Sequence, residues 1–209
     1  MKLYSIHTGY FKLDGGAMFG VVPKQMWNKL NAADENNLCR WAMRCLLIED
    51  GDRLILIDNG IGNKQDAKFM GHYHLHGDET LESSLAKYGF SKDDITDVVL
   101  THLHFDHCGG SIIREQDRLI PAFKNATFWS NERHWHWATH PNQREKASFL
   151  KENILPIQQS GQLRFVHSHV DRFDENGKIL STPFNDYISL RFVNGHTDAM
   201  MLPQIKYKE

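Results

Sequence analysis

A ten-residue segment, Thr101 to Gly110, constrains this chain more than any other feature. It reads Thr-His-Leu-His-Phe-Asp-His-Cys-Gly-Gly, which places three histidines and one aspartate within six residues. Neutral imidazoles and a carboxylate are the ligand set that suits a borderline divalent metal such as zinc. In an extended backbone, His102 and His104 project to the same side, because they are two residues apart. The segment therefore predicts a metal site, and metal-activated water makes hydrolysis the expected chemistry.

The residues around this motif are those that such a site needs. Val98, Val99 and Leu100 form an apolar run that predicts a strand leading into the motif. Asp106 and His107 can converge on the first two histidines only if the chain turns, and Gly109 and Gly110 permit that turn and a close backbone approach.

Bulk composition predicts one globular domain covering residues 1–209. Hydrophobic residues make up 41% of the chain, and a chain of this length buries a substantial core. The net charge of −2 offers no case for nucleic acid or an anionic membrane as a partner, so a small-molecule substrate is expected and a homodimer stays open. The residues from Met1 to Thr8 do not read as a signal peptide, and no apolar run approaches the 18 residues of a membrane span. Three cysteines without a CxxC spacing favour a reducing, cytoplasmic setting.

Strand and helix signals alternate along the chain, which predicts an α/β or α+β layered domain. A loop is expected over 61–79. Thr80 is expected to cap a helix through Leu81, Leu85 and Tyr88, and Asn142 with Glu145 resembles a capping box that opens a helix through Phe149 and Ile154. The expected strands cover residues 2–12, 17–22, 38–49, 53–58, 95–100, 126–130, 163–167 and 187–193.

Three segments together resemble the metallo-β-lactamase-fold hydrolase superfamily. They are the HxHxDH motif with its Gly-Gly, the Gly-His-Thr element at 195–197, and the strand and turn Leu54 to Gly60, where Asn59 stands in place of the family's threonine. The matches run in family order over most of the chain, from Arg53 to Pro203. The resemblance implies an αββα sandwich of two sheets with helices outside and a metal site at one edge.

The resemblance also implies roles for individual residues. His102, His104 and His196 would bind a first metal, and Asp106 and His107 a second. Asp106 would also orient the nucleophile. The implied cofactor is zinc, one or two ions per chain, with iron or manganese as alternatives. Three imidazoles leave one tetrahedral position open for water, as a catalytic zinc requires.

Three further residues are expected to lie beside the metal ligands without binding metal themselves. Asp58, at the end of an apolar strand, either holds a ligand or is an ordinary turn aspartate. Cys108 is expected to be a small packing residue beside the site rather than a thiolate ligand, and Thr197 to line the site after His196. The histidines at 72–76 are expected to lie in a solvated surface loop, with a flap over the metal site as the alternative. Those at 134–140 are expected to lie on a half-buried aromatic helix face, with metal or substrate binding as the alternative.

The expected function is hydrolysis of a lactone, ester or phosphotriester by metal-bound hydroxide, because the chain looks most like the lactonase and phosphotriester hydrolase branch of the superfamily. The alternatives are a thioester hydrolase of the glyoxalase II type, a mononuclear iron sulfur dioxygenase and a catalytically silent fragment. The bridging aspartate and the last histidine of two-metal members have no clear counterpart here. The fold is therefore expected to be truncated at its C-terminus.

Overall fold

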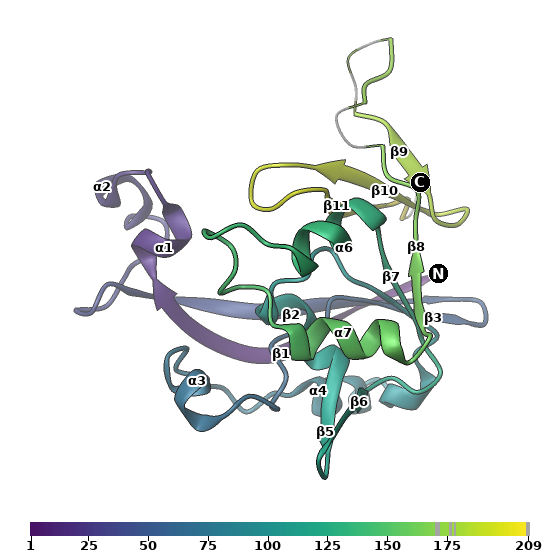
Figure 1. Cartoon of the computed structure of the whole chain (residues 1–209), viewed down its shortest axis with the longest axis horizontal. Helices are drawn as coiled ribbons and strands as arrows, with labels where there is room; N and C mark the ends of the chain where they lie inside the picture. The colour runs from purple at the N-terminus through teal and green to yellow at the C-terminus, as the bar shows by residue number, and fades with distance from the viewer. Residues whose placement is uncertain (170–171, 176, 178, 208–209) are drawn as a thin grey trace.

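The computed structural model describes residues 1–169, 172–175, 177 and 179–207, and its centre is a six-stranded sheet (Figure 1). The strand order is β1-β2-β3-β4-β7-β8, antiparallel for the first three strands and parallel from β3 onward. The strands of this sheet are β1 (Lys2–Asp14), β2 (Leu38–Asp50), β3 (Arg53–Ile57), β4 (Asp97–Val99), β7 (Thr127–Ser130) and β8 (Leu163–Phe165). The smaller sheets comprise β9 (Ser181–Pro183), β10 (Ile188–Val193) and β11 (Met200–Ile205), and the hairpin of β5 (Ile112–Glu115) and β6 (Arg118–Pro121).

Each face of the central sheet packs against a different layer of the fold. The side chains of β3 alternate, so Leu54 and Leu56 pack in one apolar cluster with α4 and α7, while Ile55 and Ile57 pack in another with β10 and β11. Figure 1 shows the three-stranded sheet above the central sheet and α4 and α7 below it. The helices are α1 (Gly15–Phe19), α2 (Lys24–Trp27), α3 (Ala67–Gly71), α4 (Leu81–Ala86), α5 (Phe105–Cys108), α6 (Glu132–Thr139) and α7 (Lys151–Gln159). This two-sheet sandwich with helices outside confirms the predicted fold class.

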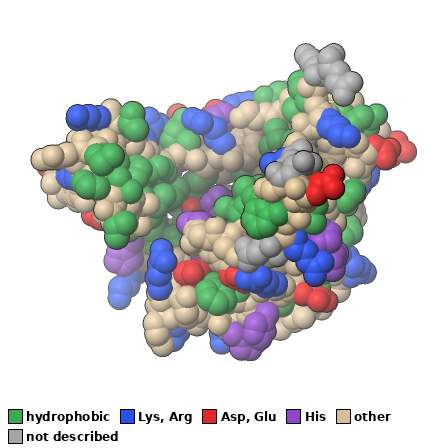
Figure 2. Space-filling view, turned by 90° about the horizontal axis from the view of Figure 1, so that it is seen from above, with side chains coloured by type: hydrophobic (Ala, Val, Ile, Leu, Met, Phe, Trp, Pro, Cys, Tyr) green, Lys and Arg blue, Asp and Glu red, His purple; other side chains and the backbone are tan. Residues whose placement is uncertain are grey.

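The predicted strand over 17–22 is wrong. The Asp14 side chain accepts a hydrogen bond from the Ala17 amide and so caps a short helix, α1, directly after β1. Gly15 lets the Trp27 ring approach closely, since a Cβ there would lie 2.3 Å from the ring. Together α1 and α2 form a lobe that leaves Val21 and Leu30 almost fully exposed, and Figure 2 shows its apolar side chains at the left.

The helix predicted to open at Asn142 is also wrong. The Asn142 side chain does accept from the Glu145 amide, but only turns follow, and α7 starts at Lys151. Within the predicted loop over 61–79, a short helix α3 was missed. The Thr80 cap of α4 and the strands predicted over 38–49, 53–58, 126–130 and 187–193 are confirmed to within a few residues. None of the helices in the described ranges is long and apolar enough to cross a bilayer.

Candidate metal centre

Two parallel strands deliver the site residues to one edge of the central sheet. In the register of β3 and β4, Ile57 lies opposite Val99, so Asp58 and the motif that begins at Thr101 emerge at the same edge. The Asp58 amide donates to the Val99 carbonyl at 3.0 Å and extends this pairing by one residue. Parallel strands end together, which is why two segments more than forty residues apart in sequence meet here.

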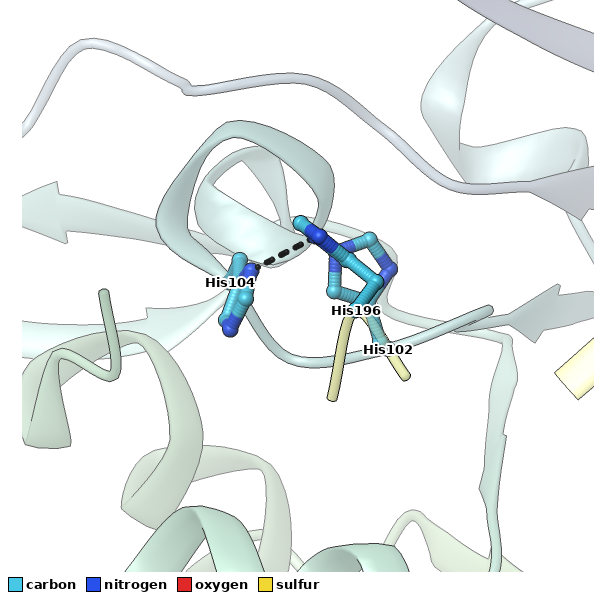
Figure 3. Close-up of side chains that lie close together, drawn as sticks. All are labelled: His102, His104 and His196. Atoms are coloured by element: carbon cyan, nitrogen blue, oxygen red, sulfur yellow. Dashed lines mark hydrogen bonds between the residues drawn. The ribbon is translucent and has the colours of Figure 1, made fainter. Parts of the chain in front are cut away.

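Three histidines converge at this edge with their ring nitrogens facing one another (Figure 3). His102 and His104 come from the motif, and His196 comes from the loop between β10 and β11. The Nε2 atom of His196 lies 3.1 Å from Nδ1 of His104 and 3.2 Å from Nε2 of His102. One ligand atom from each ring fits within 4.8 Å of the other two. The predicted three-histidine group is therefore assembled in space.

The chemistry of this donor set fits a zinc ion. Burial, followed by the neighbouring imidazoles, lowers the pKa of His104 to about 3 and holds the pKa of His102 well below its usual value, so both rings are neutral at pH 7. The edge of a tetrahedron with Zn–N bonds of 2.0–2.1 Å is about 3.3 Å, close to the two nitrogen separations above. A single N–H···N bond cannot satisfy both contacts of the His196 nitrogen, whereas one shared cation can.

Asp106 and His107 adjoin this cluster. The His107 ring centre lies 4.0 Å from that of His102, and its Nε2 atom is 3.5 Å from the Asp106 carboxylate. Its other nitrogen, Nδ1, contacts Asp58 at 2.8 Å. Burial works against protonation of His107, but the hydrogen bond to Asp58 and the negative charges of Asp58 and Asp106 together outweigh burial and raise the pKa of His107 to about 9. Both predicted ligands of a second metal thus lie together, beside a cavity of about 60 Å³.

Asp58 makes the contacts of a residue that positions ligands. Its carboxylate accepts from the amide and the hydroxyl of Thr101, each at 2.8 Å, as well as facing His107. The Thr101 hydroxyl in turn lies 3.0 Å from Nδ1 of His102. One buried carboxylate therefore touches the backbone before the motif and, directly or through one hydroxyl, two of its histidines.

Cys108 and Thr197 differ in what they touch. Cys108 is fully buried, burial raises the pKa of its thiol, and the thiol donates to the Leu103 carbonyl, so the side chain is directed to the backbone. Thr197 is buried as well, and its hydroxyl donates to the carboxylate of Glu145. Within the part of the chain that the structure describes, neither side chain hydrogen-bonds to a histidine ring of the cluster.

Two buried side chains beside the cluster were not predicted to take part in the site. The sequence predicts an aromatic helix face for His134, on α6, and a helix cap for Glu145. His134 accepts from the Leu103 amide, and Glu145 lies 3.7 Å from Nε2 of His104. The signal that could have revealed Glu145 was its position as an acidic residue in a turn between apolar segments, which is weak by itself.

The exposed histidines of α6 and the histidines at 72–76 are not part of the cluster. The rings of His136 and His140 stack on each other at the end of α6, with both residues exposed. The segment at 72–76 is a surface loop with His72 and His74 exposed, as predicted. His76 ties it to the sheet edge, because it pairs with Tyr10 of β1 through the backbone and stacks on its ring.

The sandwich and the histidine cluster at its edge define a class of metal-dependent hydrolases, and sequence comparison agrees. Residues 44–184 match the metallo-beta-lactamase superfamily, and the chain belongs to this superfamily. A probable metal-dependent hydrolase from Staphylococcus aureus has a similar structure, with a TM-score of 0.84 and 27% identity over 99% of this chain and 69% of that one.

Other relatives are lactonases. An N-acyl homoserine lactonase of Bacillus thuringiensis is 26% identical over 165 residues, which cover 74% of this chain and 56% of the lactonase. This chain therefore spans about half the length of the curated relatives. A dizinc quorum-quenching lactonase shares the fold at a TM-score of 0.71 and 20% identity, over 98% of this chain and 67% of that one.

Proposed function

We propose that this chain carries the metal centre of a zinc-dependent hydrolase that opens lactones. The observation that carries the proposal is the convergence of three neutral imidazoles, with Asp106 and His107 adjoining them, on one edge of a metallo-beta-lactamase fold. The similarity to N-acyl homoserine lactonases favours a lactone over the other esters that such a centre could hydrolyse.

The surroundings of the cluster suit a substrate with an apolar substituent. The cavity beside Asp106 and His107 is also lined by Phe11 and Met43. These two side chains belong to an apolar cluster with Phe105, which extends to aromatic residues of α3 and the loop after it. Figure 2 shows histidine atoms at the bottom of a hollow beside the apolar lobe. An acyl chain would bury apolar surface there while its ester group faces the cluster.

His102, His104 and His196 would hold the first zinc ion, and Asp106 and His107 a second. Bound zinc supplies Lewis acidity and lowers the pKa of a coordinated water to near 7. Asp106, whose side chain is 21% exposed, would accept the proton of the attacking water as the oxygen bonds to the lactone carbonyl carbon. The ring C–O bond then breaks, and the leaving alkoxide takes up a proton to give a hydroxy acid.

The test combines metal content with turnover of the 209-residue protein. Elemental mass spectrometry should find zinc in the wild type and its loss in His102→Ala, while His136→Ala, which removes an exposed histidine outside the cluster, keeps the metal. An N-acyl homoserine lactone should be hydrolysed faster than a phosphotriester or a thioester. Equal metal content in the two variants would contradict the assigned site, and a preference for the thioester would contradict the lactone assignment.

A further inference from the structure

His196 is the ligand that most needs support from its neighbours. Its side chain lies in a loop between two strands and is exposed, whereas His102 and His104 are buried. Burial therefore fixes the two motif histidines but not the third. Contacts with neighbouring side chains must therefore hold the loop at 194–198 against the motif, which lies more than ninety residues earlier in the sequence.

One such contact runs through Glu145. Its Oε2 atom accepts from the Thr197 hydroxyl at 2.7 Å and from the Trp137 indole at 3.1 Å, and it lies 3.7 Å from Nε2 of His104. Only 8% of Glu145 is exposed, so its carboxylate depends on these partners in place of water. The Glu145 carboxylate thus lies between the ring of His104 and Thr197, the residue that follows His196.

Glu145 also has the position to set which nitrogen of His104 carries the proton. The Nδ1 atom of His104 faces the cluster, so in a metal site it must be unprotonated. The proton then sits on Nε2, which is buried and has no hydrogen-bond partner among the described residues. The nearest carboxylate is Glu145, and a side-chain movement of about half an ångström would bring the two atoms within the N–H···O range. When a metal-binding imidazole donates its other N–H to a carboxylate, the carboxylate fixes the tautomer of the imidazole and raises the basicity of its metal-binding nitrogen.

A second contact runs in parallel through His134. Its Nε2 atom accepts from the amide of Leu103, which lies between the two motif ligands, at 2.9 Å. Its Nδ1 atom donates to the carbonyl of Asp198, two residues after His196, at 2.6 Å. Because Nε2 accepts an amide hydrogen, the other nitrogen must be the donor, and both ends of the ring are satisfied. Asn131, at the start of α6, adds a bond to the Ala199 carbonyl.

We infer that Glu145 and His134 are positioning residues that assemble the three-histidine site before metal binds, and that Glu145 selects the His104 tautomer with Nδ1 free. Each side chain contacts both ligand-bearing segments, and neither points a ligand atom into the three-histidine group. The inference rests on the proposed metal function, but its effect on the tautomer exists in the metal-free protein.

The experiment compares wild type with Glu145→Gln and, as a matched control, Glu132→Gln, which changes an exposed glutamate at the start of α6. Zinc affinity is measured by competition with a chromophoric chelator. We expect Glu145→Gln to weaken zinc binding about 10- to 100-fold, as for other residues behind metal ligands, and Glu132→Gln to leave it unchanged. Glutamine is close in shape to glutamate, and the melting temperature of each metal-free variant reports whether it is folded.

A second readout separates this inference from the proposed function. Nitrogen-15 NMR of metal-free protein should show His104 protonated at Nε2 in the wild type and a mixture of tautomers in Glu145→Gln. Unchanged tautomer and unchanged zinc affinity in the variant would overturn the inference. A wild type that binds no zinc would overturn the proposed function, while the tautomer comparison would still decide the role of Glu145.

Discussion

Replacing Asp58 with asparagine should destabilise the metal-free protein by about 3 kcal/mol. The carboxylate is buried and accepts three hydrogen bonds at 2.8 Å, two from Thr101 and one from His107. Asparagine can keep the bond from the Thr101 amide but presents an NH₂ group to the other two donors. Bonds to a charged group contribute about 1.5–3 kcal/mol each, so losing two at the lower value gives about 3 kcal/mol. Asp58 has a φ of +57°, which asparagine also tolerates, so backbone strain adds little.

The assay is urea unfolding of metal-free protein, followed by far-ultraviolet circular dichroism at pH 7.5. Asp186→Asn, which changes an exposed aspartate, is the control and should shift the free energy of unfolding by less than about 0.5 kcal/mol. A loss of under about 1 kcal/mol in Asp58→Asn would refute the reasoning, because it would mean that the three short contacts carry little net free energy.

The same substitution should affect the two metal positions unequally. With a carboxylate at position 58, Nδ1 of His107 keeps the proton that it donates to Asp58, so the proton that metal binding displaces is the one on Nε2, which then acts as the ligand atom. An asparagine NH₂ group favours the other tautomer, in which Nε2 is protonated and cannot act as a ligand. Zinc content should therefore fall from about two ions to about one per chain, since Asp58 contacts His107 directly but reaches the three-histidine group only through the Thr101 hydroxyl. Loss of both ions, or of neither, would contradict this assignment.

Three more outcomes follow from the contacts already described. Burial raises the pKa of the Asp97 carboxyl, but hydrogen bonds from Arg53, Thr96 and Trp129 together hold it below its usual value. This stabilisation is present above about pH 4 and lost below it, so Asp97→Asn should cost about 3 kcal/mol at pH 7 and flatten the pH dependence of urea unfolding below about pH 4. Gly109→Ala should destabilise the protein by about 3 kcal/mol in the same assay, because a Cβ there would lie 2.1 Å from the Ile61 carbonyl oxygen. Zinc at about 100 times its dissociation constant should stabilise the wild type by about 2.7 kcal/mol, which corresponds to a rise of roughly 5–10 °C in melting temperature, and should leave His102→Ala unchanged.

Much of the fold could be predicted from local sequence signals. The strands that became β2 and β3 flank a two-residue turn at Gly51, and Thr80 caps α4 through the amide of Ser83 as its position predicts. The wrong predictions occur where the local hydrogen bond forms as expected, but contacts with residues distant in sequence determine the structure that comes after it. Asn142 does bond the Glu145 amide, yet the Glu145 side chain turns to Trp137 and to the loop after β10 instead of back to the cap.

The candidate site divides in the same way. The candidate metal ligands could be predicted from sequence because few side-chain types bind zinc, and their spacing is limited by one strand and one turn. The residues that position them need only supply a donor or an acceptor, which many side chains do, and their partners are set by tertiary structure. His134 lies 31 residues from Leu103 and 64 from Asp198, and nothing local marks either pairing. It follows that glutamine at position 145 should preserve the fold while weakening the metal site, since a positioning residue is specified by its hydrogen bonds and charge rather than by its volume.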